Sequence, residues 1–462
     1  MGRKAFRGLR LVHTHLNEEP LTQDDLTDLA LLRFDLIAAI GVRKGLPGDI
    51  LVAHLMPGST KPIEIMGPQS FYDFQLDVPA FMRSLEEETE RYRLFSPNDK
   101  RERVILVSVS KKPIYEQEDS LEELKGLAHS SDLIVLDSHI QKPKVINPRY
   151  LMGEGKLKEL IINALNKGAT ILVFDQELSP SQVNAIGELT ELKVIDRSQL
   201  ILDIFARRAH SRDGKVQVEL AQLKYGLPRL TGKGTAMSRL MGGIGGRGPG
   251  EMKLEIDRRR AREKIALLER ELKSLGEARK QRKHRRIERG IPIVSIIGYT
   301  NAGKSTLLNS LTKSDVFVED KLFATLDTAS RRLRFPRERE VVITDTVGFI
   351  RDLPKDLVAA FSATLEELDD ADLLLHLIDA SNLHFDQQIE SVEKILSDLH
   401  LNEKSRLLVF NKTDKIRKEE AANLAIRYNA IIISALDPST FSPLLKAIEE
   451  HIWTENLVGA KG

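Results

Sequence analysis

Residues 298–305 are the feature that most constrains the fold of this chain. They read Gly-Tyr-Thr-Asn-Ala-Gly-Lys-Ser, which fits the pattern G-x-x-x-x-G-K-[S/T] of a phosphate-binding loop, and they follow the apolar run 291–297. Glycines let such a loop curl tightly after a strand, so that successive backbone N–H groups point at phosphate oxygens. The pattern predicts a strand, a loop and a helix that together bind a nucleoside triphosphate.

The loop ends in two residues with distinct expected roles. Lys304 places a positive charge at the β and γ phosphates, and Ser305 opens the following helix, so that its hydroxyl can bind Mg²⁺. A chance match in an unrelated turn is the alternative, and the motifs downstream argue against it. We predict nucleotide contacts along the whole loop, from Gly298, Tyr299, Thr300, Asn301, Ala302, Gly303, Lys304 and Ser305.

A second motif follows the apolar strand predicted at 341–344. It consists of Asp345, Thr346, Val347 and Gly348. We expect Asp345 to hold Mg²⁺ through a water molecule and the N–H of Gly348 to approach the γ-phosphate.

A third motif predicts which base is bound. The apolar strand 406–410 ends in Asn411, Lys412, Thr413 and Asp414. The Asp414 carboxylate can accept hydrogen bonds from the ring N–H and the amine of guanine, whereas adenine offers no such pair of donors. An unpaired buried acceptor costs roughly 1–3 kcal/mol, so GTP is favoured over ATP. After the next predicted strand, 430–433, a backbone N–H among Ser434, Ala435 and Leu436 could reach the guanine carbonyl.

A stretch without a continuous apolar pattern lies between the first two motifs. It contains Phe323, Ala324, Thr325, Leu326 and Asp327, which we include among the nucleotide-binding residues. We predict that the Thr325 hydroxyl closes on Mg²⁺ and the γ-phosphate and so orders a switch segment in the triphosphate state only. The alternative is an ordinary loop threonine. The predicted catalytic residues are then Lys304, Thr325 and Gly348, and the predicted metal ligands are Ser305, Thr325 and Asp345.

Two residues depart from the best-studied small GTPases. Phe349 stands where those proteins place a glutamine that orients the attacking water, and an apolar ring cannot do so by hydrogen bonding. We therefore expect slow intrinsic hydrolysis, with the missing group supplied by a partner or by rearranged switches. For Asn301 two interpretations stay open: its side-chain oxygen helps to hold K⁺ beside the phosphates, or it is a turn asparagine.

Composition sets the outer limits. The 462 residues suffice for about two or three domains. Cysteine is absent, which excludes disulfides and cysteine-ligated zinc and fits a reducing cytoplasm. No apolar run approaches the roughly 20 residues that span a bilayer, and the basic N-terminus lacks the apolar stretch of a secretory signal. We expect a monomeric cytoplasmic protein whose membrane association is at most peripheral.

A helical linker is predicted ahead of the nucleotide domain. Its apolar residues recur at alternating intervals of four and three, which places them on one face of a helix over 251–275: Ala261, Ile265, Leu268, Leu272 and Leu275. Gly276 interrupts this seam. We therefore predict a turn there and a returning basic helix, which makes 251–289 a helical hairpin.

Two basic segments could contact nucleic-acid phosphates. Residues 251–289 hold fifteen Lys and Arg against eight Asp and Glu, with much of the excess at 279–286. In residues 226–250, nine of 25 positions are glycine, interspersed with Lys233, Arg239 and Arg247. A solvated helix face is the open alternative for the first segment, and a disordered tether for the second.

The remaining part of the chain begins with its least informative region. Residues 1–95 could form a small accessory domain with a loop at 57–62. Residues 103–208 alternate short apolar runs with helical patterns, which predicts a parallel α/β sheet.

With these motifs in place, the chain from about 130 to 452 resembles the HflX-type GTPases of the translation-factor-related class. Besides the nucleotide motifs, the resemblance is carried by segments 150–156, 175–182, 196–205, 227–230, 242–251 and 257–259. In that family an apolar residue commonly follows the Asp-x-x-Gly motif, so Phe349 is no sign of an inactive enzyme.

The resemblance implies a fold and a function. The expected fold is α/β: an N-terminal parallel α/β domain, a helical hairpin linker and a Ras-like P-loop GTPase domain. The predicted divisions are 1–95 (accessory), 96–225 (HflX-like α/β), 226–250 (Gly-rich), 251–289 (helical hairpin) and 290–455 (GTPase). The resemblance also implies GTP and GDP as ligands, binding to the large ribosomal subunit and its RNA rather than to DNA, and a role in splitting or rescuing ribosomes.

Two alternatives from other functional classes stay open. One is a GTP-regulated RNA-remodelling protein, and the other is a regulatory binding protein that holds nucleotide only as a ligand. Co-purification separates these interpretations, because ribosomal subunits, free structured RNA or neither would be recovered.

Overall fold

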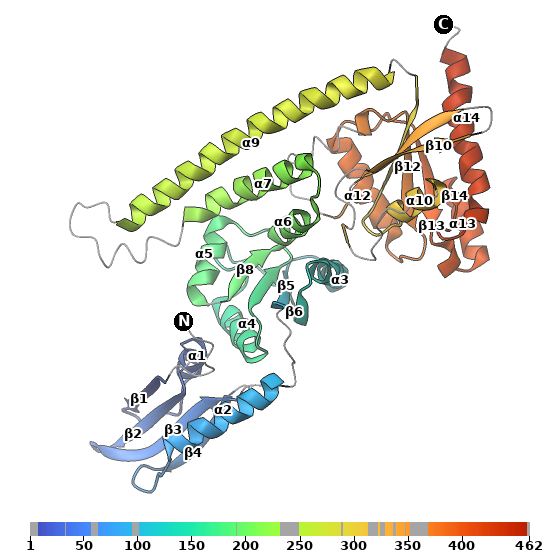
Figure 1. Cartoon of the computed structure of the whole chain (residues 1–462). Helices are drawn as coiled ribbons and strands as arrows, with labels where there is room; N and C mark the ends of the chain where they lie inside the picture. Colours follow the sequence, from blue (N-terminus) through green and yellow to red (C-terminus); the bar gives the residue numbers. More distant parts are fainter. Residues whose placement is uncertain are drawn as a thin grey trace. The chain divides into compact units, whose positions relative to one another are not determined.

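Three separate sheets organise the described part of the chain (Figure 1). The computed structural model describes residues 8–32, 34–56, 63–94, 101–190, 192–231, 249–287, 290–312, 322–323, 329–335, 339–346, 348–351 and 368–459. The chain divides into two compact units, Met1–Arg197 and Ser198–Gly462. In the part that the structure describes, no helix is both long and apolar enough to cross a membrane.

The first sheet lies within the region that was least informative as sequence. Its strands are β1 (Arg10–His15), β2 (Leu36–Arg43), β3 (Leu46–Leu55) and β4 (Ile63–Ser70), in the order β1-β2-β3-β4. β1 and β2 are parallel and the other pairs antiparallel. A parallel pair needs a crossover, which α1 (Gln23–Leu31) supplies, and α2 (Val78–Leu94) follows β4. The loop predicted at 57–62 lies outside the described residues.

The second sheet is fully parallel, as predicted. It contains β5 (Arg103–Val109), β6 (Ile134–Gln141), β7 (Ile171–Phe174) and β8 (Lys193–Asp196), in the order β6-β5-β7-β8. The helices α3 (Ile114–Ser130), α4 (Glu154–Asn166) and α5 (Pro180–Leu189) connect its strands. Both faces are covered, so a strand such as β5 is buried along almost its whole length.

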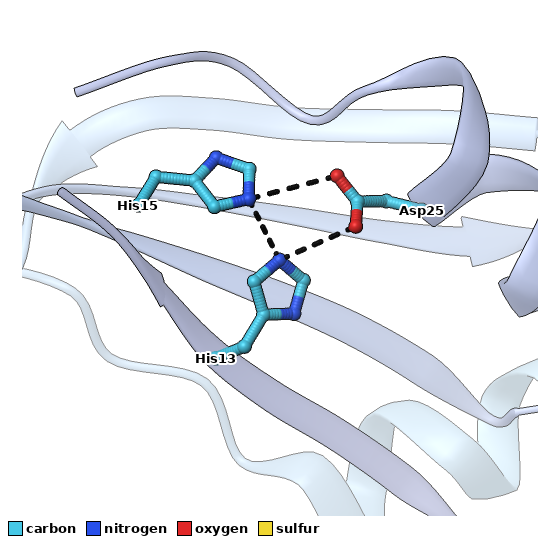
Figure 2. A group of neighbouring side chains, drawn as sticks. All are labelled: His13, His15 and Asp25. Carbon is cyan, nitrogen blue, oxygen red and sulfur yellow. Dashed lines mark hydrogen bonds and ion pairs between the residues drawn. The ribbon is translucent and has the colours of Figure 1, made fainter. Parts of the chain in front are cut away.

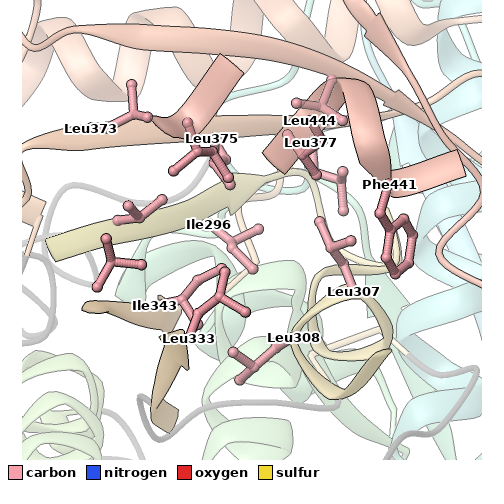
Figure 3. Close-up of a cluster of buried hydrophobic side chains, with 14 of the residues drawn as sticks. Ile296, Leu307, Leu308, Leu333, Ile343, Leu373, Leu375, Leu377, Phe441 and Leu444 are labelled. Carbon is pink, nitrogen blue, oxygen red and sulfur yellow. The ribbon is translucent and has the colours of Figure 1, made fainter. Parts of the chain in front are cut away.

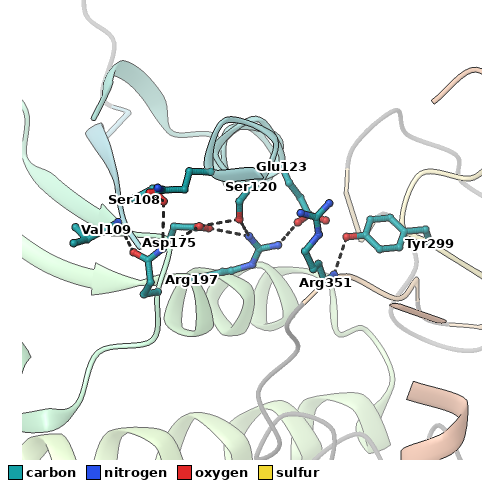
Figure 4. A network of polar contacts seen from close by, with 10 residues as sticks. Ser108, Val109, Ser120, Glu123, Asp175, Arg197, Tyr299 and Arg351 are labelled. Carbon is teal, nitrogen blue, oxygen red and sulfur yellow. Dashed lines mark hydrogen bonds and ion pairs between the residues drawn. The ribbon is translucent and has the colours of Figure 1, made fainter. Parts of the chain in front are cut away.

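A buried ionic network joins the elements of this sheet (Figure 4). The Arg197 side chain is 6% exposed; its Nη1 lies 2.9 Å from Oδ1 of Asp175, and its Nη2 pairs with Glu123. The N–H of Leu178 donates to the carboxylate of Asp196 at 2.9 Å. These contacts join segments 175–182 and 196–205, two of the segments that carry the family resemblance. Asp175 and Glu123 neutralise the charge of Arg197, as a buried cation requires.

A pair of helices leads into the nucleotide domain. After α6 (Arg197–Arg208), α7 (Arg212–Gly226) and the short helix η1 (Leu227–Thr231), the chain forms α9 (Pro249–Ile287). Leu268 and Leu272 of the predicted seam pack with Val216 and Leu220 of α7. Figure 1 shows α7 and α9 side by side and running in opposite directions.

The turn predicted at Gly276 is wrong. α9 is one continuous helix of 39 residues that passes through this position. The helical hairpin linker therefore consists of α7 and α9, with 232–248 between them outside the described residues, and not of two halves of 251–289. One glycine costs a helix about 1 kcal/mol relative to alanine, which a long helix packed on a partner can tolerate. The side chains of 279–286 also lie outside the described residues.

The third sheet has the order β10-β11-β9-β12-β13-β14. Its strands are β9 (Ile293–Gly298), β10 (Ala329–Arg334), β11 (Glu340–Asp345), β12 (Leu373–Asp379), β13 (Arg406–Asn411) and β14 (Ile431–Ile432). Only the edge strand β10 is antiparallel to its neighbour among these pairs. This is the predicted parallel sheet of a Ras-like P-loop domain.

Helices cover this sheet and close its core (Figure 3). They are α10 (Lys304–Thr312), α12 (Phe385–Asp398), η2 (Thr413–Lys415), α13 (Lys418–Tyr428), η3 (Pro438–Phe441) and α14 (Ser442–Gly459). Ile296 of β9 and Leu375 of β12 pack with Leu307 of α10 and Leu444 of α14, all fully buried. This core fixes β9 and α10, which hold the loop between them.

Candidate nucleotide-binding site

The predicted motifs converge at one edge of the third sheet. β11, β9, β12 and β13 are adjacent and parallel, so their carboxyl ends lie together. The phosphate-binding loop follows β9, Asp345 ends β11 and Asn411 ends β13. Ligands of open parallel sheets bind at this edge, where the loops after the strands meet.

Two loop glycines are required by close contacts. Gly298 and Gly303 have φ values of +144° and +94°, which other residues rarely adopt. A Cβ on Gly298 would collide with the Leu377 carbonyl of β12, and one on Gly303 would collide with the side-chain amide of Asn411. Asn301 also has positive φ, +62°, a conformation that asparagine tolerates, so a turn role alone accounts for it.

Lys304 is buried at the centre of the loop. Its Nζ donates hydrogen bonds to the carbonyl oxygens of Tyr299, at 2.9 Å, and Gly298, at 3.2 Å. The pKa of Lys304 is lowered to about 8, chiefly by burial; the Asp345 carboxylate partly opposes this shift, and the nearby charge of Lys412 adds to it. The ammonium group is therefore held in a place where a phosphate anion would stabilise its charged form.

Ser305 and Asp345 are in direct contact although 40 residues separate them. The Ser305 hydroxyl donates to Oδ2 of Asp345 at 2.5 Å, and the Asp345 side chain is fully buried. A hydroxyl and a carboxylate are the hard oxygen donors that Mg²⁺ prefers. These two residues fit the metal site predicted for them.

The segment after β11 lies against the loop. Thr300 N donates to the Phe349 carbonyl at 2.7 Å, and Phe349 N donates to the Gly298 carbonyl at 3.1 Å. A Cβ on Gly348 would lie 2.9 Å from Lys304 Nζ and 2.8 Å from Thr300 Cα. Only a glycine lets the backbone at Gly348 come this close to the lysine.

A further contact extends this attachment. Tyr299 accepts a hydrogen bond on its hydroxyl from Arg351 N at 2.7 Å (Figure 4). The Phe349 side chain is buried, and its apolar ring carries no hydrogen-bonding group that could hold water at the site. Thr346 donates through its hydroxyl to the Ile296 carbonyl at 2.8 Å, and Val347 lies outside the described residues.

Asn411 connects the phosphate end of the site to the base end. Its Nδ2 donates to the Ala302 carbonyl, and its Oδ1 accepts from Ala435 N, both at 2.8 Å. Ser434 donates through its hydroxyl to Oδ1 of Asp414 at 2.6 Å, and Thr413 donates to the Ile433 carbonyl at 2.9 Å. The two predicted base-recognition segments therefore form one unit, from which the Leu436 side chain extends with 76% exposure.

Sequence reasoning missed Asp379, which belongs to this site through its contact with the predicted residue Lys412. Lys412, which has a φ of +62°, forms an ion pair through Nζ with Oδ2 of Asp379 at 2.8 Å. Asp379 ends β12, the strand between the two motif-bearing strands β9 and β13. An aspartate after the apolar run 373–378 was the available signal, because it has the same form as Asp345 after β11.

Of the predicted switch segment, the structure describes only Phe323. Its N–H donates to Oγ1 of Thr300 at 2.8 Å, and its ring meets that of Phe205 on α6 edge to face, with centroids 4.7 Å apart. Phe205 is a second residue that sequence reasoning did not place near the site. Ala324, Thr325, Leu326 and Asp327 lie outside the described residues, so the role of Thr325 stays a prediction.

Three family models match consecutive parts of this chain. They are described as GTP-binding GTPase N-terminal over residues 118–206, GTP-binding GTPase Middle Region over 208–286, and 50S ribosome-binding GTPase over 293–412. The third spans the loop, Asp345 and Asn411 but ends before Asp414. Residues 1–117 lie outside all three matches.

The chain is similar to curated proteins over most of its length. It is 49% identical over 358 residues to GTPase HflX of Caldanaerobacter subterraneus, covering 78% of this chain and 82% of that protein. It is 41% identical over 362 residues to GTPase HflX of Escherichia coli, covering 78% and 85%. A solved GTP-binding protein from Sulfolobus solfataricus, in complex with GDP, is 26% identical with a TM-score of 0.40 and covers 76% of this chain and 98% of that one.

Proposed function

Because this chain belongs to the HflX family of GTPases, we propose that it binds the large ribosomal subunit and couples GTP binding and hydrolysis to splitting or rescuing ribosomes. The chain is a GTP hydrolase with a ribosome-binding GTPase domain.

One observation carries the assignment of the residues. Lys304, the Ser305–Asp345 pair and the Asn411–Asp414 segment come from three separate parts of the sequence and meet at the carboxyl edge of one sheet. A chance P-loop pattern in an unrelated turn would not bring these groups together.

The phosphates would lie in the curled loop. An entering phosphate oxygen would replace the carbonyls of Gly298 and Tyr299 as the partner of Lys304. The ammonium group would then stabilise the negative charge that develops on the phosphate during phosphoryl transfer. The N–H of Gly348 would approach the γ-phosphate from the other side. Mg²⁺, when bound, would neutralise phosphate charge; Ser305 would bind it directly, Asp345 through water, and Thr325 on closure of the switch.

The base would lie against Asp414. Oδ1 of this carboxylate accepts the Ser434 hydroxyl, which holds the side chain in one orientation. Asn411 fixes the segment through Ala302 and Ala435, so the base end and the phosphate end keep a constant separation. This supports guanine as the base and the backbone of 434–436 as a further contact.

The ribosome would supply what the site lacks for fast hydrolysis. The buried Phe349 cannot orient water, so the described residues hold the phosphates better than they activate a nucleophile. We propose that contact with the large subunit completes the site, and that the nucleotide state in turn sets the affinity for that subunit.

The test is GTP turnover by the pure protein, alone and with purified large ribosomal subunits. We expect slow turnover alone and strong stimulation by large subunits, with Lys304→Ala inactive in both conditions. Small subunits serve as the control. Unchanged turnover with large subunits contradicts the ribosomal role and leaves the GTP site intact, whereas full activity of Lys304→Ala contradicts the site itself.

The same assay tests the role of Asn301. Turnover in K⁺ and in Na⁺ should differ if its side chain helps to hold a monovalent cation beside the phosphates. Equal rates leave Asn301 as a turn residue, which its positive φ already explains.

A further inference from the structure

Two histidines and an aspartate meet in the first sheet, outside the residues that the family models match (Figure 2). His13 and His15 are two positions apart on β1, so their side chains lie on the same face of the strand. Asp25 lies in the first turn of α1, which packs on that face through Leu26 and Leu29. Among the described residues this is the one group of three such side chains close enough to hold a metal ion.

The distances between the potential ligand atoms suit a metal ion. Nε2 of His13 and Nε2 of His15 are 2.9 Å apart, and they lie 3.4 Å and 3.6 Å from the two Asp25 oxygens. Metal–ligand bonds of 2.0–2.1 Å in a tetrahedral zinc site separate neighbouring ligand atoms by about 3.3 Å. Small side-chain adjustments would give that geometry.

The orientation of His15 points its lone pair into the group. Its Nδ1 lies 2.7 Å from the Glu19 carbonyl oxygen, which can only accept, so Nδ1 carries the proton. In a neutral imidazole Nε2 is then an acceptor. In metal-binding histidines, the ring nitrogen that does not bind the metal usually donates to a backbone carbonyl or a carboxylate, as Nδ1 of His15 does here.

The Asp25 carboxylate is also held in place. Its Oδ2 accepts from the backbone N–H and from the hydroxyl of Thr22, both at 2.7 Å, in a capping box at the start of α1. Oδ1 faces His13. This ligand atom is therefore positioned by the helix start and not by a flexible surface side chain.

Hydrogen bonding alone satisfies this arrangement poorly. With both imidazoles neutral, the Nε2 proton of His13 is shared between two acceptors, His15 Nε2 and Asp25 Oδ1. His15 Nε2 and Asp25 Oδ2 then face each other at 3.6 Å as two acceptors with no proton between them. A cation at the centre would pair with all three groups.

We propose that His13, His15 and Asp25 bind one divalent transition-metal ion of the zinc class, which joins β1 to the start of α1. Two imidazole nitrogens and one carboxylate oxygen favour Zn²⁺ over Mg²⁺, which prefers oxygen ligands. The side chains are 25%, 11% and 18% exposed, so a fourth position remains open to water or another ligand. The site is separate from the nucleotide site and does not depend on the proposed function.

The experiment is a zinc titration of the full-length, tag-free protein, stripped with a chelator and then saturated with GDP and Mg²⁺. We expect one tight zinc equivalent at pH 7.5, at least tenfold weaker in His15→Gln. Because the chain has eleven histidines, a matched control is needed. His139→Gln provides it: Nε2 of His139 lies 3.2 Å from Asp137 across the same two-residue spacing on a strand, but this pair is not part of a three-ligand group.

Two further measurements keep the test decisive if His15→Gln folds poorly. Asp25→Asn retains a side-chain acceptor for Thr22, so it should fold and still lose the tight equivalent. Co²⁺ bound to the wild-type protein should give the intense visible absorption of a four-coordinate ion. Equal zinc affinity in wild type, His15→Gln and Asp25→Asn, or only the weak absorption of six-coordinate Co²⁺, would overturn the proposal.

Discussion

At the residue scale, the site depends on a buried lysine whose charge the nucleotide would stabilise. Lys304 is 6% exposed, and burial lowers its pKa to about 8. A bound phosphate lies close enough to raise this pKa again. Nucleotide binding and protonation of Lys304 should therefore be linked.

The sign of this linkage gives a testable pH dependence. Below pH 8 the lysine is already charged and binding needs no proton, whereas above pH 8 binding takes up a proton and nucleotide affinity falls, by up to about tenfold per pH unit. Calorimetry at pH 8 in buffers of different ionisation enthalpy should show an uptake of roughly half a proton, and at pH 6.5 almost none. Equal uptake at the two pH values would contradict the assignment of the shift to Lys304.

Asp414 provides a second prediction at this scale. In Asp414→Asn an N–H donor replaces the acceptor that faces the base, while the amide oxygen can still accept from Ser434. We expect the preference to shift by at least tenfold from GTP toward xanthosine triphosphate, which has a carbonyl where guanine has its amine. Competition binding with both nucleotides measures the shift. A variant that still prefers GTP would contradict the predicted contact, and Ser439→Ala, outside the contact, should keep the wild-type preference.

At the element scale, the parallel strands position the site and the helices connect it to the remaining chain. Each functional segment begins where a buried strand ends, so the order β11-β9-β12-β13 decides which segments are neighbours. The contact between Phe323 and Phe205 gives α6 a direct link to the segment after α10. A change in that segment would therefore reach α6 without passing through the sheet.

The continuity of α9 gives a prediction for Gly276. A Cβ at this position meets nothing within 4 Å, and the residue lies inside a continuous helix. We expect Gly276→Ala to raise the free energy of unfolding of the α7–α9 pair by about 0.5–1 kcal/mol, because alanine has the higher helix propensity. Urea unfolding followed by circular dichroism measures this change. A loss of stability would instead support the turn predicted at Gly276. As a control, Gly303→Ala should be destabilising in the same assay, because Gly303 has a positive φ and the added Cβ would collide with Asn411.

At the scale of the whole molecule, the two compact units should respond differently to nucleotide. All of the predicted nucleotide-binding residues lie in Ser198–Gly462, whereas the first two sheets lie in Met1–Arg197. A ligand stabilises the part of a protein that binds it. The nucleotide should therefore leave local opening in the first sheet unchanged.

Hydrogen exchange with and without GDP and Mg²⁺ measures this difference. We expect slower exchange at 293–312, 340–346 and 406–414 and unchanged exchange in β1–β4. Lys304→Ala should lose the protection at low nucleotide concentration. Slower exchange across β1–β4 would contradict independent behaviour of the first sheet and would indicate coupling between the units.

The sequence by itself determined the local parts of this protein. The loop 298–305, Asp345 and 411–414 were predictable because each is a short pattern beside an apolar strand, and the alternation of runs in 103–208 predicted a parallel sheet. Gly276 shows the limit of such reasoning, because local propensity favoured a break that packing on α7 overrides.

Only the tertiary structure decided which distant residues meet. Asn411 bonds to Ala302 across 109 positions, and Lys412 pairs with Asp379, since strand order and register place their ends together. The His13–His15–Asp25 group likewise requires α1 to pack on one face of β1. A sequence pattern records spacing along the chain, whereas these contacts depend on which faces and strand ends the buried core brings together.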